Sequence, residues 1–348
     1  MGALTERAGK GTVKTIMFKA KSSSAAGLLR GGVQALNKKR RLNRWAYALF
    51  RALLLFSISY IILFPLFYMI SNAFKPMEQL LDPSIAWIPK SLTLENFRLA
   101  AAAMDYGNSF LVSLRVGVVS ALLQVFTCSY IAYGFARFRF RGRGLLFGLV
   151  ILTVIVPPQA IIVPMYLNFT NVDFLGIIRG ISSLTGTEIK INLIDTPFTF
   201  YIPSLLGVGL RSGLFIFIYR QFFQNLPREL EEAAWIDGAG PLRAYFSIAV
   251  PNSSIATLTV LIFSIVWHWN DIYLSSMFFV EEFPLSVSLS QIRKGLELTS
   301  GFAASADTAT VRTILMAGCL LFIAPILLMY LFLQKRFIQS IETVGIVG

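Results

Sequence analysis

The stretch QNLPRELEEAAWIDGAGPLRAYFSIAVP, residues 224–251, is a polar island between two long apolar segments. Pro227 is suited to a first helical position, and the charged residues after it favour turns that face water. Gly238 and Gly240 interrupt the helical pattern, and Pro241 is suited to open a second helix. The sequence therefore predicts a short helix, a break and another short helix. Because such a segment cannot lie in lipid, it is expected at a membrane face, where another protein can dock on it.

The rest of the chain has the composition of a membrane protein. Hydrophobic residues make up 55% and charged residues only 14% of its 348 residues, whereas soluble domains carry roughly 25% charged residues. About six apolar runs are long enough to cross a hydrocarbon core of ~30 Å. We therefore predict an all-α membrane protein with about six transmembrane helices. The predicted spans are residues 46–72, 109–135, 145–167, 200–222, 255–277 and 313–333.

The positions of Lys and Arg predict the orientation. The net charge is +13, and the basic residues gather in the tail 1–44, in the loop after the second predicted span, in the island and at the carboxyl end. With six spans, these segments all lie on one side, whereas the opposite loops are mixed in charge. The positive-inside rule then places both termini and the island in the cytoplasm. We interpret the basic charge as contact with membrane lipid, and no nucleic-acid partner is expected.

The island resembles a long, gapped motif, the EAA coupling loop of binding-protein-dependent ABC importer permeases. The residues that carry this resemblance are Glu232, Ala233, Ala234, Asp237, Gly238, Ala239, Phe246 and Pro251. Other strings resemble carbohydrate-type permeases, above all the maltose-type G subunit. They are YGFAR at 133–137, WHWNDIY at 267–273 and QKRF at 334–337. One departure from the family pattern is an apparent external insertion at about residues 168–190.

The resemblance implies a permease subunit of an ATP-driven ABC importer in a bacterial or archaeal plasma membrane. It implies transport of a sugar or oligosaccharide that an external solute-binding protein delivers. The implied partners are a second, homologous permease and two cytoplasmic ATPase subunits, which would dock on the coupling loop (residues 224–251). The predicted organisation is a basic cytoplasmic tail (1–44), a permease domain (45–334) and a cytoplasmic carboxyl-terminal tail (335–348).

The chain itself is not expected to be an enzyme. It contains no G-x-x-x-x-G-K-[ST] sequence, so ATP hydrolysis is expected in a separate subunit. With one His and two Cys, the sequence offers no credible metal site, and no cofactor is expected in this chain.

Charged side chains inside predicted spans are costly and mark candidate functional positions. Arg211 falls near the middle of the predicted span 200–222. It either faces the substrate pathway or pairs with an acid of a partner subunit. Arg115 lies about two turns inside the second predicted span, and it is either a pathway residue or extends towards the membrane surface.

Polar residues at two other places are further pathway candidates. Pro157 and Pro158 are expected to break the third predicted span, beside a cavity or as a packing kink, and Gln159 follows them. Asn270 and Asp271 end an aromatic cluster in the fifth predicted span. They either line an external mouth or, for Asp271, lie at the membrane interface.

Two other classes of protein remain as alternatives. An ion- or proton-coupled secondary transporter would also have about six spans and buried arginines, but it would normally show inverted repeats or acids within the spans. A membrane enzyme would need a cluster of His, Asp or Cys at one membrane face, and the sequence offers none. Co-purification of an ATPase is the observation that distinguishes an importer from both.

Overall fold

The computed structural model describes residues 44–80, 88–173, 176, 182–184, 190–300 and 308–345. Every regular element in these ranges is helical. The predicted basic tail lies outside the described residues except for Arg44, and so does much of the predicted insertion at about 168–190. The chain divides into two compact units, Met1–Tyr68 and Met69–Gly348.

Most of the first unit's described part belongs to one helix, Arg44–Ala73, which is 30 residues long and strongly apolar. None of its most apolar 18-residue window is buried within the chain. Its length confirms a helix over the predicted span 46–72. A helix of this length and hydropathy is suited to cross a bilayer.

The central element of the second unit is α3 (Tyr106–Arg137), a helix of 32 residues. It packs against α7 (Phe198–Leu205), α8 (Ser212–Asn225) and α12 (Ser254–Asn270). Small and polar residues recur on its buried face, and they let the neighbouring backbones approach closely. These residues are Ser109, Ser113, Gly117, Ser120, Ala121, Gln124, Cys128 and Ala132.

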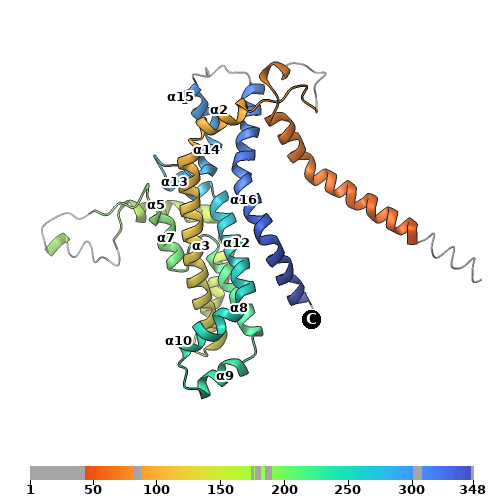
Figure 1. The fold of residues 1–348 in the computed structure, drawn as a ribbon. Coiled ribbons are helices and arrows are strands. Elements are labelled where there is room, and N and C mark those ends of the chain that lie inside the picture. The colour runs from red at the N-terminus through yellow and green to blue at the C-terminus, as the bar shows by residue number, and fades with distance from the viewer. Residues whose placement is uncertain are drawn as a thin grey trace, which may run out of the picture. The chain divides into compact units, whose positions relative to one another are not determined.

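Short helices gather at the two ends of α3 (Figure 1). At its carboxyl-terminal end lie α9 (Glu229–Ile236), α10 (Pro241–Ala244), a π-helical turn (Tyr245–Ala249) and α11 (Val250–Asn252). At its amino-terminal end lie α2 (Glu95–Ala103), α14 (Leu285–Ser290) and α15 (Ile292–Ser300). The remaining helices are α4 (Arg143–Ile155), α5 (Ile162–Thr170), α13 (Tyr273–Phe278) and α16 (Thr308–Gly345), with short 3₁₀ turns at Met77–Gln79 and Pro158–Ala160.

Within the described residues, three helices are long and apolar enough to cross a membrane: Arg44–Ala73, Tyr106–Arg137 and Thr308–Gln334. A fourth span arises if α12 and the bent segment before it, which meet at 76°, count as one. The predicted third span is broken, because α4 ends at Ile155 before Pro157 and Pro158, as expected from these prolines. The predicted continuous helix over 200–222 is wrong. It is two helices, α7 and α8.

Candidate functional site

The coupling loop has the local structure that its sequence predicts. Helix α9 ends at Ile236, and Gly238 adopts a left-handed conformation with φ of +80°. The amide of Gly238 donates to the carbonyl of Trp235 at 3.0 Å, and that of Ala239 donates to the carbonyl of Ala234 at 2.9 Å. This pair of bonds is a Schellman motif, which needs a left-handed residue and therefore favours glycine. The break between α9 and α10 is thus a specific backbone geometry.

One face of the coupling loop is exposed. Of the residues predicted to dock an ATPase, Glu232, Ala233, Asp237 and Gly238 are exposed, and Ala234 and Ala239 are half-buried. Large apolar side chains are exposed around them, and Ile236 is 87% exposed. The others are Leu230, Trp235, Leu242 and Phe246. An exposed apolar patch with a carboxylate beside it is typical of a protein-interaction surface.

The opposite face of α9 is fixed to α3 by an ion pair that sequence reasoning missed. Arg137 donates from Nε to Oε1 of Glu231 at 2.8 Å, and the two side chains are only 5% and 2% exposed. Arg137 also donates from Nη2 to the carbonyl of Leu226 at 2.9 Å. The resemblance to the EAA motif singles out Glu232 for docking, but nothing in the local pattern signals that its neighbour Glu231 is buried. The structure buries Glu231 and exposes Glu232.

The second arm of the coupling loop reaches the same face of α3. The hydroxyls of Tyr245 and Ser129 are hydrogen-bonded at 2.7 Å. The Tyr133 ring packs against those of Tyr245 and Phe223, with centroids 5.1 Å and 5.6 Å apart. Ser129, Tyr133 and Arg137 are spaced by four residues and therefore share one face of the helix. Both arms of the loop are thus attached to the last turns of α3.

Arg211 lies in a break and not inside a continuous helix. It precedes α8 with φ of +61°, is exposed, and its guanidinium carbon lies 5.3 Å from the centre of the Trp267 ring. It lines a cavity of about 470 Å³ between α4, α7 and α8, and it is the charged residue of that lining. No described acid pairs with it.

The break before Arg211 has a tertiary cause. Gln124, in the middle of α3, donates to the carbonyl of Leu210 at 2.8 Å and to the hydroxyl of Ser212 at 2.8 Å. These hydrogen bonds replace backbone hydrogen bonds that a continuous helix would make between α7 and α8. Gly207, with φ of +72°, turns the backbone there. Because Gln124 is far from this segment in sequence, apolar periodicity alone predicted an unbroken helix.

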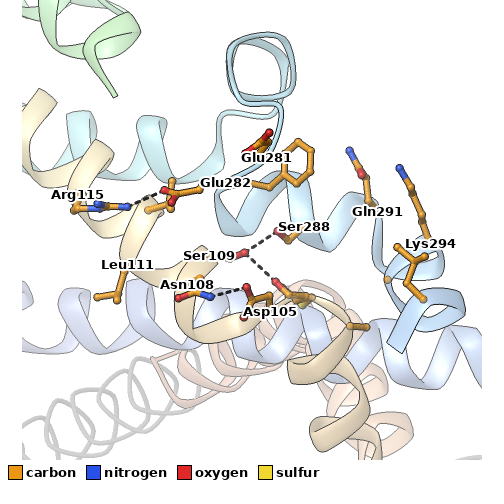
Figure 2. Close-up of a pocket in the computed structure, with 16 residues that line it drawn as sticks. Asp105, Asn108, Ser109, Leu111, Arg115, Glu281, Glu282, Ser288, Gln291 and Lys294 are labelled. Carbon is orange, nitrogen blue, oxygen red and sulfur yellow. Dashed lines mark hydrogen bonds and ion pairs between the residues drawn. The ribbon is translucent and has the colours of Figure 1, made fainter. Parts of the chain in front are cut away.

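A second, polar pocket of about 610 Å³ lies at the amino-terminal end of α3. Figure 2 shows Ser109 facing Ser288 and Arg115 facing Glu282, while Asn108 donates to Asp105 on the same side of the pocket. Arg115 contacts Glu282 at 3.3 Å, and the hydroxyls of Ser109 and Ser288 lie 2.8 Å apart. The ion pair is largely exposed, so water screens it strongly. Gln291 and Lys294 complete a lining rich in hydrogen-bonding groups.

The other predicted pathway residues lie elsewhere. Gln159 is exposed in the short turn after Pro158, and neither it nor Asn270 lines one of these two cavities. Asp271 follows α12 and accepts from the amide of Ser275 at 2.8 Å, so it caps α13. The structure therefore brings Arg115 and Arg211 to two different cavities and gives Asp271 a structural partner.

Comparisons with known proteins show what the chain is similar to. Residues 124–343 match the family "Binding-protein-dependent transport system inner membrane component". The polygalacturonan/rhamnogalacturonan transport system permease protein YtcP of Bacillus subtilis is 28% identical, over 83% of this chain and 93% of its own length. The diacetylchitobiose uptake system permease protein NgcG of Streptomyces coelicolor is also 28% identical, over 88% and 90%. The melibiose/raffinose/stachyose import permease protein MelC of Bacillus subtilis is 29% identical, over 77% and 86%.

A solved structure shares the fold. A chain of a bacterial ABC transporter involved in the import of the acidic polysaccharide alginate aligns with a TM-score of 0.60. The alignment covers 84% of this chain and 96% of that one, at 20% identity. The prediction of an importer permease is supported over that of a secondary transporter. Because the family match spans more than half of its length, the chain belongs to the binding-protein-dependent transport system inner membrane components.

Proposed function

We propose that this chain is a permease subunit that carries a sugar or an oligosaccharide across a bacterial or archaeal plasma membrane. Its family makes it an inner-membrane component of a binding-protein-dependent importer. The relatives YtcP, NgcG and MelC are named for saccharides of several kinds, and this supports a carbohydrate substrate. An external solute-binding protein would deliver the substrate, and both chain termini would be cytoplasmic.

The complete transporter would contain a second, homologous permease and two cytoplasmic ATPase subunits. The exposed apolar surfaces of this chain support additional membrane subunits. The helix Arg44–Ala73 has no buried residue in its most apolar window, and such a surface is suited to lipid and to another helix alike. ATP binding would draw the ATPases together, and rigid-body movement of the permeases would alternate access to the pathway.

The exposed face of the coupling loop is the observation that carries this proposal. Glu232 would offer its carboxylate to a basic or amide group of the ATPase, while Ala233 and Ala234 permit close approach. Ile236 and Trp235 are exposed beside them and would be buried on docking. At roughly 25 cal/mol per Å² of buried apolar surface, two such side chains contribute substantially to an interface. The opposite face of α9 is fixed to α3, so the docked face would be presented in one orientation.

The substrate pathway is proposed at the breaks in the helices. Arg211 lines the cavity between α4, α7 and α8, and interrupted helices at membrane depth are tolerated where they line a cavity. Arg115 would lie at the external mouth, in the polar pocket of Figure 2. Gln159, Asn270 and Asp271 would contribute less directly, since Asp271 already caps α13.

A cross-linking experiment on the whole transporter tests the docking. Single cysteines replace Ile236 in the coupling loop or Ile88 before α2, both of which are more than 80% exposed. We expect the cysteine at 236 to cross-link to a co-purifying ATPase, and the cysteine at 88 to give no such product. The same ATPase product from position 88, or none from 236 in a complex that contains an ATPase, contradicts the proposal.

A further inference from the structure

The coupling loop and the polar pocket of Figure 2 lie at opposite ends of one long helix. Helix α3 begins beside the polar pocket of Figure 2 and ends at Arg137 under the coupling loop. Its 32 residues span about 48 Å at ~1.5 Å per residue. A displacement at its last turn is therefore delivered to the pocket at its first turn if the helix moves as a rigid body.

We propose that the buried ion pair between Arg137 and Glu231 is the joint that transmits movement of α9 to α3. The proposal rests on the proposed docking of an ATPase on α9. It gives the two adjacent glutamates of α9 separate tasks. Glu232 faces outward to the ATPase, and Glu231 faces inward to α3.

The geometry of Arg137 makes the joint rigid in more than one direction. Its planar guanidinium donates to Glu231 at 2.8 Å and to the backbone carbonyl of Leu226 at 2.9 Å. Leu226 directly follows the last residue of α8, so one side chain holds α3, α9 and the end of α8. Tyr133 makes a longer contact to the second carboxylate oxygen of Glu231, at 3.4 Å. A fork with two fixed partners resists rotation in a way that a lysine ammonium does not.

The chemistry of the ion pair also favours a role beyond holding the two helices together. Two charges that are 5% and 2% exposed lose most of their hydration, and apolar residues of similar volume often stabilise a protein as well as a buried pair does. A hydrogen-bonded pair differs from apolar contacts in that it also fixes the orientation of α9 relative to α3. The second arm of the loop meets α3 through Tyr245 and Ser129, two turns before Arg137. Rotation of either arm therefore turns the end of α3 with it.

The test uses the complete transporter in lipid nanodiscs, with Cys128 and Cys319 replaced by alanine. One pair of spin labels, at Asn108 and Lys294, spans the pocket of Figure 2. Distances are measured without nucleotide and after trapping with ATP and orthovanadate. We expect a distance shift in the parent protein and its loss in Glu231→Gln, while the ATPase still co-purifies. Arg137→Lys should lose part of the shift, and Glu229→Gln, on an exposed residue of α9, should retain it.

A shift retained in Glu231→Gln overturns the joint, and so does the absence of any shift in the parent protein. If no ATPase co-purifies with the parent, the proposed docking fails instead, so the two failures are distinguishable. A second pair of labels, at Glu229 and Arg139, keeps the test valid where Glu231→Gln does not assemble. We expect no shift across this pair on trapping, because α9 and the end of α3 move together. A shift across it shows that the joint opens, and it overturns the inference.

Discussion

Replacing Gly238 by valine should impair coupling while leaving the protein folded in the membrane. Gly238 has φ of +80°, and a Cβ added there meets nothing within 4 Å. The added Cβ therefore meets no packing obstacle, and the main cost is the left-handed backbone conformation. A left-handed conformation costs an ordinary residue roughly 1–2 kcal/mol, and a β-branched residue tolerates it least. This is small beside a typical folding free energy of about 5–15 kcal/mol, so insertion and assembly should survive.

The same energy has a large effect on the local equilibrium between geometries of the break between α9 and α10. A change of ~1–2 kcal/mol lowers the ratio of native to other loop geometries about 5- to 30-fold. We expect substrate-stimulated ATP hydrolysis in proteoliposomes to fall by up to this factor, because the ATPase then meets α9 and α10 in the wrong arrangement. Gly238→Asn should fall much less, since asparagine visits the left-handed region at little cost.

Gly240 provides the matched control two residues away. It is extended, with φ of −73° and ψ of 169°, and a Cβ there also meets nothing within 4 Å. Gly240→Val adds the same side chain to the same loop without left-handed strain, and it should keep most of the activity. Equal activity in the two valine variants refutes the argument from backbone geometry. If that equal activity is low in both, side-chain bulk, and not the break, controls docking.

Three further predictions follow from the fold. Arg211 adopts a left-handed backbone conformation without being glycine, so Arg211→Gly should relieve about 1–2 kcal/mol of strain. The variant should keep its thermal stability and show lower uptake. Unchanged uptake contradicts a pathway role, and loss of complex yield indicates pairing with a partner subunit. A Cβ added at Gly213 would meet Thr153 and the carbonyl of Val150, so Gly213→Val should destabilise the protein by ~1–3 kcal/mol, as overpacking typically does, and lower its yield and melting temperature. A Cβ added at Gly148 meets nothing within 4 Å, so Gly148→Val should change both less. Equal melting temperatures contradict the close approach of α4 and α8. Single cysteines at Arg141 and Gln339 should label only from the cytoplasm, and those at Ser91 and Leu298 only from outside; external labelling at position 339 contradicts the predicted orientation.

Composition and local pattern were sufficient for a helical membrane protein and for the helix–break–helix geometry of residues 224–251. Apolar runs longer than a bilayer thickness leave few alternatives to membrane helices. The break at Gly238 was predictable, because a Schellman motif depends on residues within one turn of each other and its signal is a glycine. The break at Pro157 and Pro158 was predictable for the same local reason, since proline lacks the amide that a helix needs.

Contacts between residues far apart in sequence decided the rest. The break before Arg211 depends on Gln124, which bonds the freed carbonyl of Leu210 from a different helix, and nothing in the local apolar pattern reports that bond. Which glutamate of α9 is buried depends on Arg137, about ninety residues earlier. The motif marks Glu232, but the local apolar pattern does not report that Glu231 is buried. A local motif fixes where the chain turns, but only packing against α3 determines which side of each turn faces a partner and which is held inside.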